Sequence, residues 1–305
     1  MKHTNKLIGV TALTSISALA YYGVCKRGFE KVFRSKNRLE EMLAYLETEE
    51  MLTSIQWYNQ MKTDEIWIKS EDDLNLHGIK IANYPKSNRW VIFVHGYSSN
   101  FYDMLEEAIQ FEKEEYNILL IDHRGCGISD GKYTSMGYYE SDDLCLWIEQ
   151  IRCEHEDAKI VLYGESMGAS ACVLALGKLE ENQVQCVIAD SGYTSLKEIL
   201  AFTLKKSYKV PFASIEPLFS QMIKSTLGFK MKDVDCLNVL KENMVPIMFV
   251  HGEEDSIVPF EMVFDNYYAN RGVKELFTIS GVGHCQGKSK SDYYQRVHRF
   301  IERFI

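Results

Sequence analysis

The stretch Ile160-Val161-Leu162-Tyr163-Gly164-Glu165-Ser166-Met167-Gly168 decides which fold the rest of the chain must fit. Its first four residues are an unbroken apolar run, which is typical of a strand buried on both faces of a parallel sheet. The run leads directly into a Gly-x-Ser-x-Gly pattern, and small residues typical of a helix start follow it. A serine on such a strand-to-helix turn has a strained backbone and an exposed hydroxyl, and the glycines allow close packing. Ser166 is therefore the candidate nucleophile.

The same pattern occurs a second time, at Gly127-Ile128-Ser129-Asp130-Gly131. The pattern alone cannot choose between the two serines, so the structural context has to decide. Lys132-Tyr133-Thr134 follows Ser129, and no helix begins there. Ser129 is therefore predicted to be a loop residue.

Strands and helices alternate along the chain after residue 60. The candidate strands are Glu65–Lys69, Leu74–Ala82, Trp90–His95, Ile118–Asp122, Lys159–Tyr163, Gln185–Ala189, Pro246–His251 and Glu275–Ser280. The candidate helices are Phe101–Lys113, Tyr138–Cys153, Met167–Leu179, Leu196–Ser207, Glu261–Asn270 and Tyr293–Phe304. The pattern predicts an α/β fold with a mainly parallel eight-stranded sheet flanked by helices. The first two strands alternate apolar and polar residues, which favours an antiparallel edge.

In such a sheet the functional groups collect where the parallel strands end. A serine hydroxyl needs a general base that is oriented by a carboxylate. Asp255 follows the next-to-last strand and His284 follows the last, which gives the order Ser, Asp, His that this topology requires. Glu254 and Asp190 remain competing carboxylates because one adjoins Asp255 and the other also ends a strand.

Three other histidines, His95, His123 and His251, also stand at strand ends, where we expect buried hydrogen-bonded rings. Acyl transfer further needs two backbone N–H groups that stabilise the developing oxyanion. The amide of Met167, at the helix start, is one candidate. The amide of Tyr97, after His95-Gly96, is the other, although the same three residues could form a plain tight turn.

The composition restricts the possible partners. The 305 residues carry a net charge of −9, and residues 1–38 hold eight Lys and Arg against one Glu. The remainder of the chain is therefore acidic, which argues against a nucleic-acid partner. The eight cysteines contain no C-x-x-C pair and no zinc-ligand spacing, so they read as free thiols. The predicted chemistry needs no metal and no organic cofactor.

The N-terminal residues 1–34 contain an uncharged run of 18 residues, from Leu7 to Val24, with Lys and Arg on both sides. Its length is at the short end for a membrane span. We expect a retained anchor, with a membrane partner and with the following domain on the cytoplasmic side, because more positive charge follows the run than precedes it. A signal peptide cleaved near Ala18-Leu19-Ala20, which would give a secreted protein, and a buried helix are the alternatives.

Two further segments complete the predicted organisation. Residues 35–63 are predicted to form an amphipathic linker helix, with apolar residues at helical spacing between Leu39 and Leu52. Residues 64–305 form the main domain, and about 201–235 is long enough for a helical lid. Residues 201–232 hold six lysines among aromatic residues. Such a lid could bind anionic or lipid-like acyl substrates or a membrane surface, or its aromatic residues could simply pack inward.

Over about residues 64–304 the chain resembles the serine-hydrolase branch of the α/β-hydrolase superfamily, which contains lipase-, esterase- and aminopeptidase-like enzymes. The segments that carry the resemblance are His95-Gly96-Tyr97-Ser98, Asp122-His123-Arg124-Gly125-Cys126-Gly127-Ile128-Ser129, Gly164–Gly168, His251-Gly252-Glu253-Glu254-Asp255-Ser256-Ile257-Val258-Pro259 and Gly283-His284. It is also similar to bacterial members with an N-terminal hydrophobic segment. Asp72-Asp73-Leu74 departs from the Asp-Gly-Leu that such proteins often have, which leaves that turn in doubt.

The sequence thus predicts a serine hydrolase of carboxylic esters or thioesters, acting on a small-molecule or lipid-like acyl substrate. Ser166 would be the nucleophile, His284 the base and Asp255 the acid that orients it. Peptidase action of the aminopeptidase type is one alternative, and a non-catalytic membrane-tethered binding protein is the other.

Overall fold

The computed structural model describes residues 19–35, 49–209 and 211–305. Eight strands form one sheet in the order β1-β2-β4-β3-β5-β6-β7-β8. The strands are β1 (Asp64–Lys69), β2 (Asn75–Ile81), β3 (Arg89–Val94), β4 (Asn117–Ile121), β5 (Lys159–Glu165), β6 (Cys186–Asp190), β7 (Ile247–Gly252) and β8 (Lys274–Ile279). β1 pairs antiparallel with β2 and β2 with β4, and every later pairing is parallel. The predicted fold class and the antiparallel edge are both confirmed.

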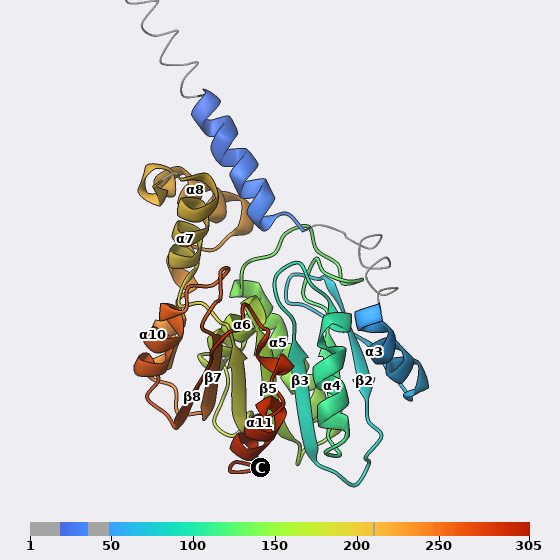
Figure 1. The fold of residues 1–305 in the computed structure, drawn as a ribbon. Coiled ribbons are helices and arrows are strands. Elements are labelled where there is room, and N and C mark those ends of the chain that lie inside the picture. Colours follow the sequence, from blue (N-terminus) through green and yellow to red (C-terminus); the bar gives the residue numbers. More distant parts are fainter. Residues whose placement is uncertain (1–18, 36–48, 210) are drawn as a thin grey trace, which may run out of the picture.

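Two apolar cores lie on opposite faces of this sheet, because alternate side chains of a strand point to opposite sides. In β3, Trp90, Ile92 and Val94 belong to one core, whereas Val91 and Phe93 belong to the other. The first core is covered by α5 (Tyr138–Glu154), α6 (Met167–Leu176) and α10 (Glu261–Ala269). The second is covered by α3 (Glu49–Gln60), α4 (Leu105–Glu112) and α11 (Tyr293–Ile301) (Figure 1). The sheet is therefore buried on both faces, as the unbroken apolar runs indicated.

The segment between β6 and β7, where the sequence predicts a lid and which is called the lid below, is built from short helical pieces. They are α7 (Leu196–Tyr208), η2 (Phe212–Ser214), α8 (Glu216–Met222), η3 (Ile223–Leu227), η4 (Met231–Asp233) and α9 (Cys236–Leu240). Phe212, Phe219 and Phe229 are buried, whereas all six lysines of residues 201–232 are exposed. These three aromatic side chains therefore pack inward.

The structure corrects the prediction of a membrane anchor in residues 1–34. Residues 1–18 lie outside the described part of the chain, and within the described part we find no helix of sufficient length and apolarity for a membrane span. Residues 19–33 form a helix in which Cys25, Phe29 and Phe33, spaced four residues apart, are buried in the first core. Such a stripe is typical of a helix that packs one face on a protein surface. The predicted span, the membrane partner and the membrane-anchored location are therefore wrong.

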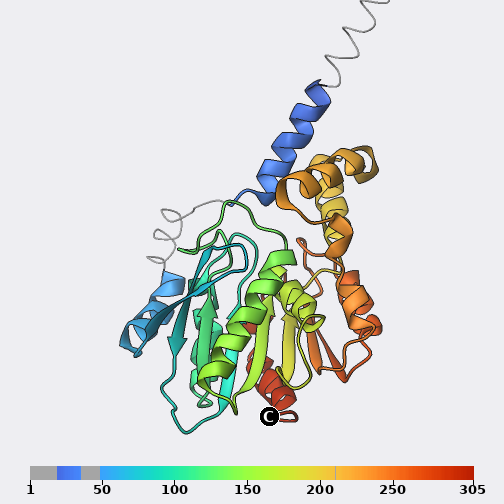
Figure 2. The ribbon, with the colours of Figure 1, turned by 180° about the vertical axis from the view of Figure 1, so that it is seen from behind.

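Helix 19–33 packs on the lid and on the loop that follows β3. The rings of Phe29 and Phe33 lie 6.0 Å from that of Phe219 in α8. The Tyr21 hydroxyl donates to the carbonyl of Ser214 at 2.6 Å, and the Tyr97 hydroxyl donates to that of Val32 at 2.7 Å. Figures 1 and 2 both show this helix beside α8, above one edge of the sheet.

The predicted linker helix is described only in its last part. Residues 36–48 lie outside the described part of the chain, so most of the amphipathic pattern predicted between Leu39 and Leu52 cannot be compared with the structure. The described helix α3 packs on the second core, with the ring of Tyr58 5.7 Å from that of Phe101. The division of the chain at residues 34 and 63 stays a prediction.

Candidate active site

The parallel pairing of β5, β6 and β7 brings three strand ends to one edge of the sheet. Glu165 pairs with Asp190, and the amide of Ser166 donates to the carbonyl of Asp190 at 2.8 Å. The amide of Cys285 in turn donates to the hydroxyl of Ser191 at 3.3 Å. Residue 284 is thus tied to the strand next to Ser166 although the two are far apart in sequence.

Ser166 occupies the sharp turn between β5 and α6. Its φ is 55° and its ψ is −116°, a combination that non-glycine residues rarely adopt. A Cβ on Gly168 would overlap the carbonyl oxygen of Val94, and one on Gly164 would lie 2.6 Å from the carbonyl oxygen of Gly168. Glycine is required at both positions, so the turn packs directly against β3 and holds Ser166 at the end of its strand.

Asp255 and His284 are hydrogen-bonded to each other. The Nδ1 atom of His284 lies 2.6 Å from Oδ2 of Asp255, whose side chain is fully buried. The amides of Ile257 and Val258 donate to Oδ1 at 2.7 and 2.9 Å. Burial opposes the charged form, but hydrogen bonds from His251 and His284 outweigh it and hold the pKa of Asp255 well below its usual range. A carboxylate fixes the proton on Nδ1 of His284 and leaves Nε2 as the basic nitrogen.

The competing carboxylates do not reach His284. Asp190 is buried, and its two oxygens accept hydrogen bonds from the hydroxyls of Ser191, at 2.8 Å, and Tyr293, at 2.9 Å. Burial is the main cause that raises the pKa of Asp190. Glu254 is exposed. Among the three carboxylates, only Asp255 combines burial with a hydrogen bond to His284.

No hydrogen bond joins Ser166 to His284, although both lie in the described part of the chain. The bridge that the sequence reasoning required between these two side chains is therefore not formed in this structure. Hydrogen bonds between a nucleophile and its base are often long in a ligand-free site and tighten when substrate binds. The structure brings the two loops together, and their closing contact stays a prediction.

The loop after β3 packs beside Ser166. A Cβ on Gly96 would lie 3.4 Å from Cβ of Ser166, so the residue before Tyr97 is in direct contact with the turn. Met167 is the first residue of α6, where a backbone N–H has no acceptor within the helix. Met167 and the residue before Tyr97 therefore both adjoin Ser166, and their role as oxyanion donors stays a prediction.

The second Gly-x-Ser-x-Gly serine has a structural place. The Ser129 hydroxyl donates to the carbonyl of Asp122 and accepts from the amide of His77, both at 2.8 Å. It thereby joins the loop after β4 to β2. Ser129 lies in a loop, as its context indicated.

The strand-end histidines are buried rings, as expected, but one of them touches the candidate site. The amide of His123 donates to Nε2 of His95 at 3.0 Å, so these two rings bond to each other's backbone beneath the loop after β3. His251 instead places Nε2 3.1 Å from Oδ2 of Asp255. Sequence reasoning missed this contact, and the four-residue spacing between His251 and Asp255 at a strand end was the available signal.

A buried ion-pair cluster under the turn was also missed. Lys288 Nζ lies 2.6 Å from Oε1 of Glu107 and 3.6 Å from Oε1 of Glu165, the residue before Ser166. No pattern in the sequence pairs residues so far apart. Within the described ranges, no group of three or more His, Cys, Asp and Glu side chains is arranged to hold a metal ion.

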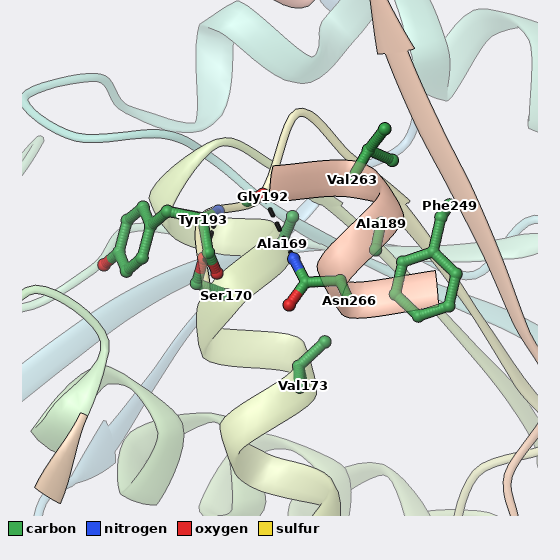
Figure 3. A pocket seen from close by; sticks show the side chains of 9 residues that line it. All are labelled: Ala169, Ser170, Val173, Ala189, Gly192, Tyr193, Phe249, Val263 and Asn266. Atoms are coloured by element: carbon green, nitrogen blue, oxygen red, sulfur yellow. Dashed lines mark hydrogen bonds between the residues drawn. The ribbon is translucent and has the colours of Figure 1, made fainter. Parts of the chain in front are cut away.

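A small cavity lies behind the turn, between α6 and α10. Figure 3 shows Ala169 and Ser170 of α6 facing Val263 and Asn266 of α10, and the amide of Asn266 donates to the carbonyl of Gly192 at 3.3 Å. The cavity measures about 10 Å³, which is at the lower limit for one water molecule. It is too small to hold an organic ligand.

Comparison with known proteins supports the fold described above. A family model described as serine aminopeptidase, S33, matches residues 85–226. The uncharacterized protein YqkD of Bacillus subtilis is 27% identical over 270 residues, which cover 88% of each chain. The Pyrococcus furiosus esterase Pf2001 superposes with a TM-score of 0.65 at 28% identity, covering 80% of this chain and 93% of the esterase. The acylaminoacyl peptidase of Pyrococcus horikoshii, 19% identical with a TM-score of 0.61 over 82% of this chain and 43% of its own, shares the fold. The chain has the α/β-hydrolase fold, and its relatives support a place in the α/β-hydrolase superfamily and a hydrolase activity.

Proposed function

We propose that this protein is a serine hydrolase that cleaves carboxylic esters or thioesters through an acyl-enzyme intermediate. The observation that carries the proposal is the strained backbone of Ser166, together with the 2.6 Å bond between Asp255 and His284 at the neighbouring strand ends. A serine hydroxyl becomes nucleophilic when a base removes its proton, and the base needs a carboxylate that fixes its tautomer.

The reaction would proceed in two steps, formation of the acyl-enzyme and its hydrolysis. Oγ of Ser166 attacks the acyl carbon while its proton passes to Nε2 of His284. The amides of Tyr97 and Met167 stabilise the resulting oxyanion, and His284 then returns the proton to the leaving alkoxide or thiolate. In the second step Nε2 of His284 takes a proton from a water molecule, whose oxygen attacks the acyl carbon. The proton then returns to Oγ of Ser166 as the carboxylic acid leaves. Each oxyanion donor is worth about 3–4 kcal/mol in such sites.

A small-molecule acyl substrate is favoured over a peptide by two observations. Solved neighbours above 25% identity are described as an esterase. A peptidase of the aminopeptidase type would need a carboxylate that anchors the substrate amine, and the carboxylates nearest the turn, Asp190 and Glu165, are already engaged with Tyr293 and Lys288. Peptide cleavage is therefore an outcome of the test.

The test is labelling with a fluorophosphonate probe followed by turnover assays. Wild type should label, Ser166→Ala should not, and Ser129→Ala, the matched control from the second Gly-x-Ser-x-Gly motif, should label like wild type. A chain-length series of p-nitrophenyl esters and thioesters is then compared with aminoacyl nitroanilides. Equal labelling of wild type and Ser166→Ala would disprove the nucleophile, and turnover of the anilides alone would replace the ester assignment with a peptidase.

A further inference from the structure

The carboxylate of Asp255 has two imidazole neighbours on the same oxygen. Oδ2 lies 2.6 Å from Nδ1 of His284 and 3.1 Å from Nε2 of His251. His284 stands in the loop after β8, whereas His251 belongs to β7 itself and is fully buried. A rigid strand residue therefore contacts the atom that orients the candidate base.

The surroundings of His251 determine where its proton is. Nε2 also lies 3.2 Å from the carbonyl oxygen of Val258. A carbonyl and a carboxylate can only accept, so Nε2 carries the hydrogen and donates to both. Within the described part of the chain, Nδ1 is buried without a hydrogen-bond partner. A second proton there would be a buried donor without an acceptor, which is costly, so the ring stays neutral.

With His251 included, the Asp255 carboxylate accepts four hydrogen bonds. The amides of Ile257 and Val258 hold Oδ1, and the two imidazoles hold Oδ2. The three donors other than His284 come from β7 and from the loop that follows it. They fix both the plane of the carboxylate and the position of Oδ2, and this position sets the orientation of the His284 ring.

We propose that His251 is a positioning residue of the active site: its neutral Nε2–H donor holds Oδ2 of Asp255 in the orientation that aligns His284. This inference rests on the proposed function for its effect on catalysis, although the geometry itself does not. The donor also shares the negative charge of the carboxylate, so that less of this charge stabilises the protonated form of His284. The charged or titratable groups that face His251 are Asp255 and, on β6, Asp190.

The test compares two replacements that differ only in the donor. In His251→Gln the amide nitrogen takes the place of Nε2 and can donate, whereas His251→Met has nearly the same shape and cannot. We expect kcat of His251→Met to fall about tenfold with little change in KM, because an aligning hydrogen bond to a charged group is lost. His251→Gln should retain kcat within about threefold of wild type. The acidic midpoint of the pH–rate profile should move to higher pH in His251→Met only.

A control pair of variants tests whether the difference between the Gln and Met replacements is specific to His251. His298 of α11 is a largely buried histidine that packs on Phe111, with ring centroids 4.7 Å apart, and it takes no part in the site. His298→Gln and His298→Met should have equal kcat and equal pH profiles. Equal kcat and pH profiles for the two His251 variants, or a split of the same size at His298, would overturn the inference.

Two further measurements separate this inference from the proposed function. If wild type shows no turnover and no labelling, the proposed function fails, and the titration of the His284 ring nitrogens is then followed by ¹⁵N NMR in the same two His251 variants. Equal titration midpoints would overturn the inference as well. If neither variant folds, wild type decides, because ¹⁵N NMR must show His251 with its proton on Nε2. A proton on Nδ1 instead would refute the inference.

Discussion

Replacement of Lys288 by methionine tests whether the buried ion-pair cluster under the nucleophile turn stabilises the fold. Lys288 belongs to η5 (Gly287–Ser289), in the loop that also carries His284, and its ammonium lies 2.6 Å from Glu107, 3.6 Å from Glu165 and 3.8 Å from Glu106. Burial opposes the charged form, but the Glu107 carboxylate outweighs it and raises the pKa of Lys288. The loop is thereby tied to α4 and to the end of β5.

The expected cost follows from what Lys288→Met leaves behind. The Glu107 side chain is 0% exposed, so its carboxylate would remain buried without a cation. Removing one partner of a buried pair costs about 3–5 kcal/mol. We expect about 3 kcal/mol, the lower end, because the Lys288 side chain is 22% exposed and water can reach part of the site.

Urea unfolding at neutral pH, followed by circular dichroism, measures this cost. The double variant Glu107→Gln/Lys288→Met removes the stranded charge and should recover at least half of the lost free energy. Lys290→Met, an exposed lysine of the same loop, is the matched control and should change the free energy of unfolding by less than about 0.5 kcal/mol. A loss below about 1 kcal/mol in Lys288→Met, or a double variant no more stable than the single one, would refute the reasoning.

Three other predictions follow from the same structure. Gly168→Ala should lower the free energy of unfolding in urea by at least about 3 kcal/mol, because the new Cβ meets the rigid backbone of Val94. Gly281→Ala, in open space but with a positive φ, should lower it by only about 1 kcal/mol. Similar losses in the two variants would contradict the packing argument. Burial, the largest cause, raises the pKa of Glu165, so the folded state holds a proton that the unfolded state releases above about pH 4.5, and the free energy of unfolding falls as pH rises. In Glu165→Gln this fall should be smaller by up to about 1.4 kcal/mol per pH unit. Parallel curves of unfolding free energy against pH for wild type and Glu165→Gln would contradict the prediction. Phe29→Ala should lower the free energy of unfolding by about 3–4 kcal/mol and speed proteolytic cleavage of the lid, because Phe29 is 2% exposed and packs on α8. An unchanged cleavage pattern would mean that helix 19–33 does not hold the lid.

The sheet could be predicted from the sequence because each strand carries its own signal. The later strands are short apolar runs that end at glycine or at a polar residue, and such runs are buried on both faces wherever they occur. All eight lie within two residues of their predicted limits. The candidate site was predicted from the same signal, since the groups at the ends of parallel strands meet at one edge. Ser166, Asp255 and His284 could therefore be chosen without knowing any distance.

The contacts around the site could not be predicted, because they join residues with no common pattern. Lys288 and Glu107 are 181 positions apart in the sequence, and neither stands at a strand end. A lone lysine or glutamate in a sequence is most simply read as exposed. Only the packing of α4 against the loop after β8 buries both charges, and this packing depends on the whole second core.

The turn at Asp73 shows how a local departure is accommodated. The family resemblance led us to expect glycine at this position, and Asp73 adopts a φ of 67°, in the left-handed region that favours glycine. Aspartate tolerates this region better than most residues. The neighbouring Asp72 accepts from both terminal nitrogens of Arg124, at 3.0 and 3.1 Å, which fixes the turn from its other side. The aspartate at position 73 therefore changes one backbone preference, and the turn still forms.

The span was predicted from the length of the uncharged run Leu7–Val24, and the described helix, residues 19–33, overlaps only residues 19–24 of it. A membrane span needs apolar residues all round the helix, whereas Cys25, Phe29 and Phe33 form one stripe beside the exposed Lys26 and Arg27. The uncharged run ends at Val24, so the buried residues Cys25, Phe29 and Phe33 follow the predicted span, whereas Tyr21, which donates to Ser214, lies within it. The carbonyl of Val32 then accepts from the hydroxyl of Tyr97, whose amide is a proposed oxyanion donor. Helix 19–33, which shares only residues 19–24 with the predicted span, therefore contacts the loop that lies beside Ser166.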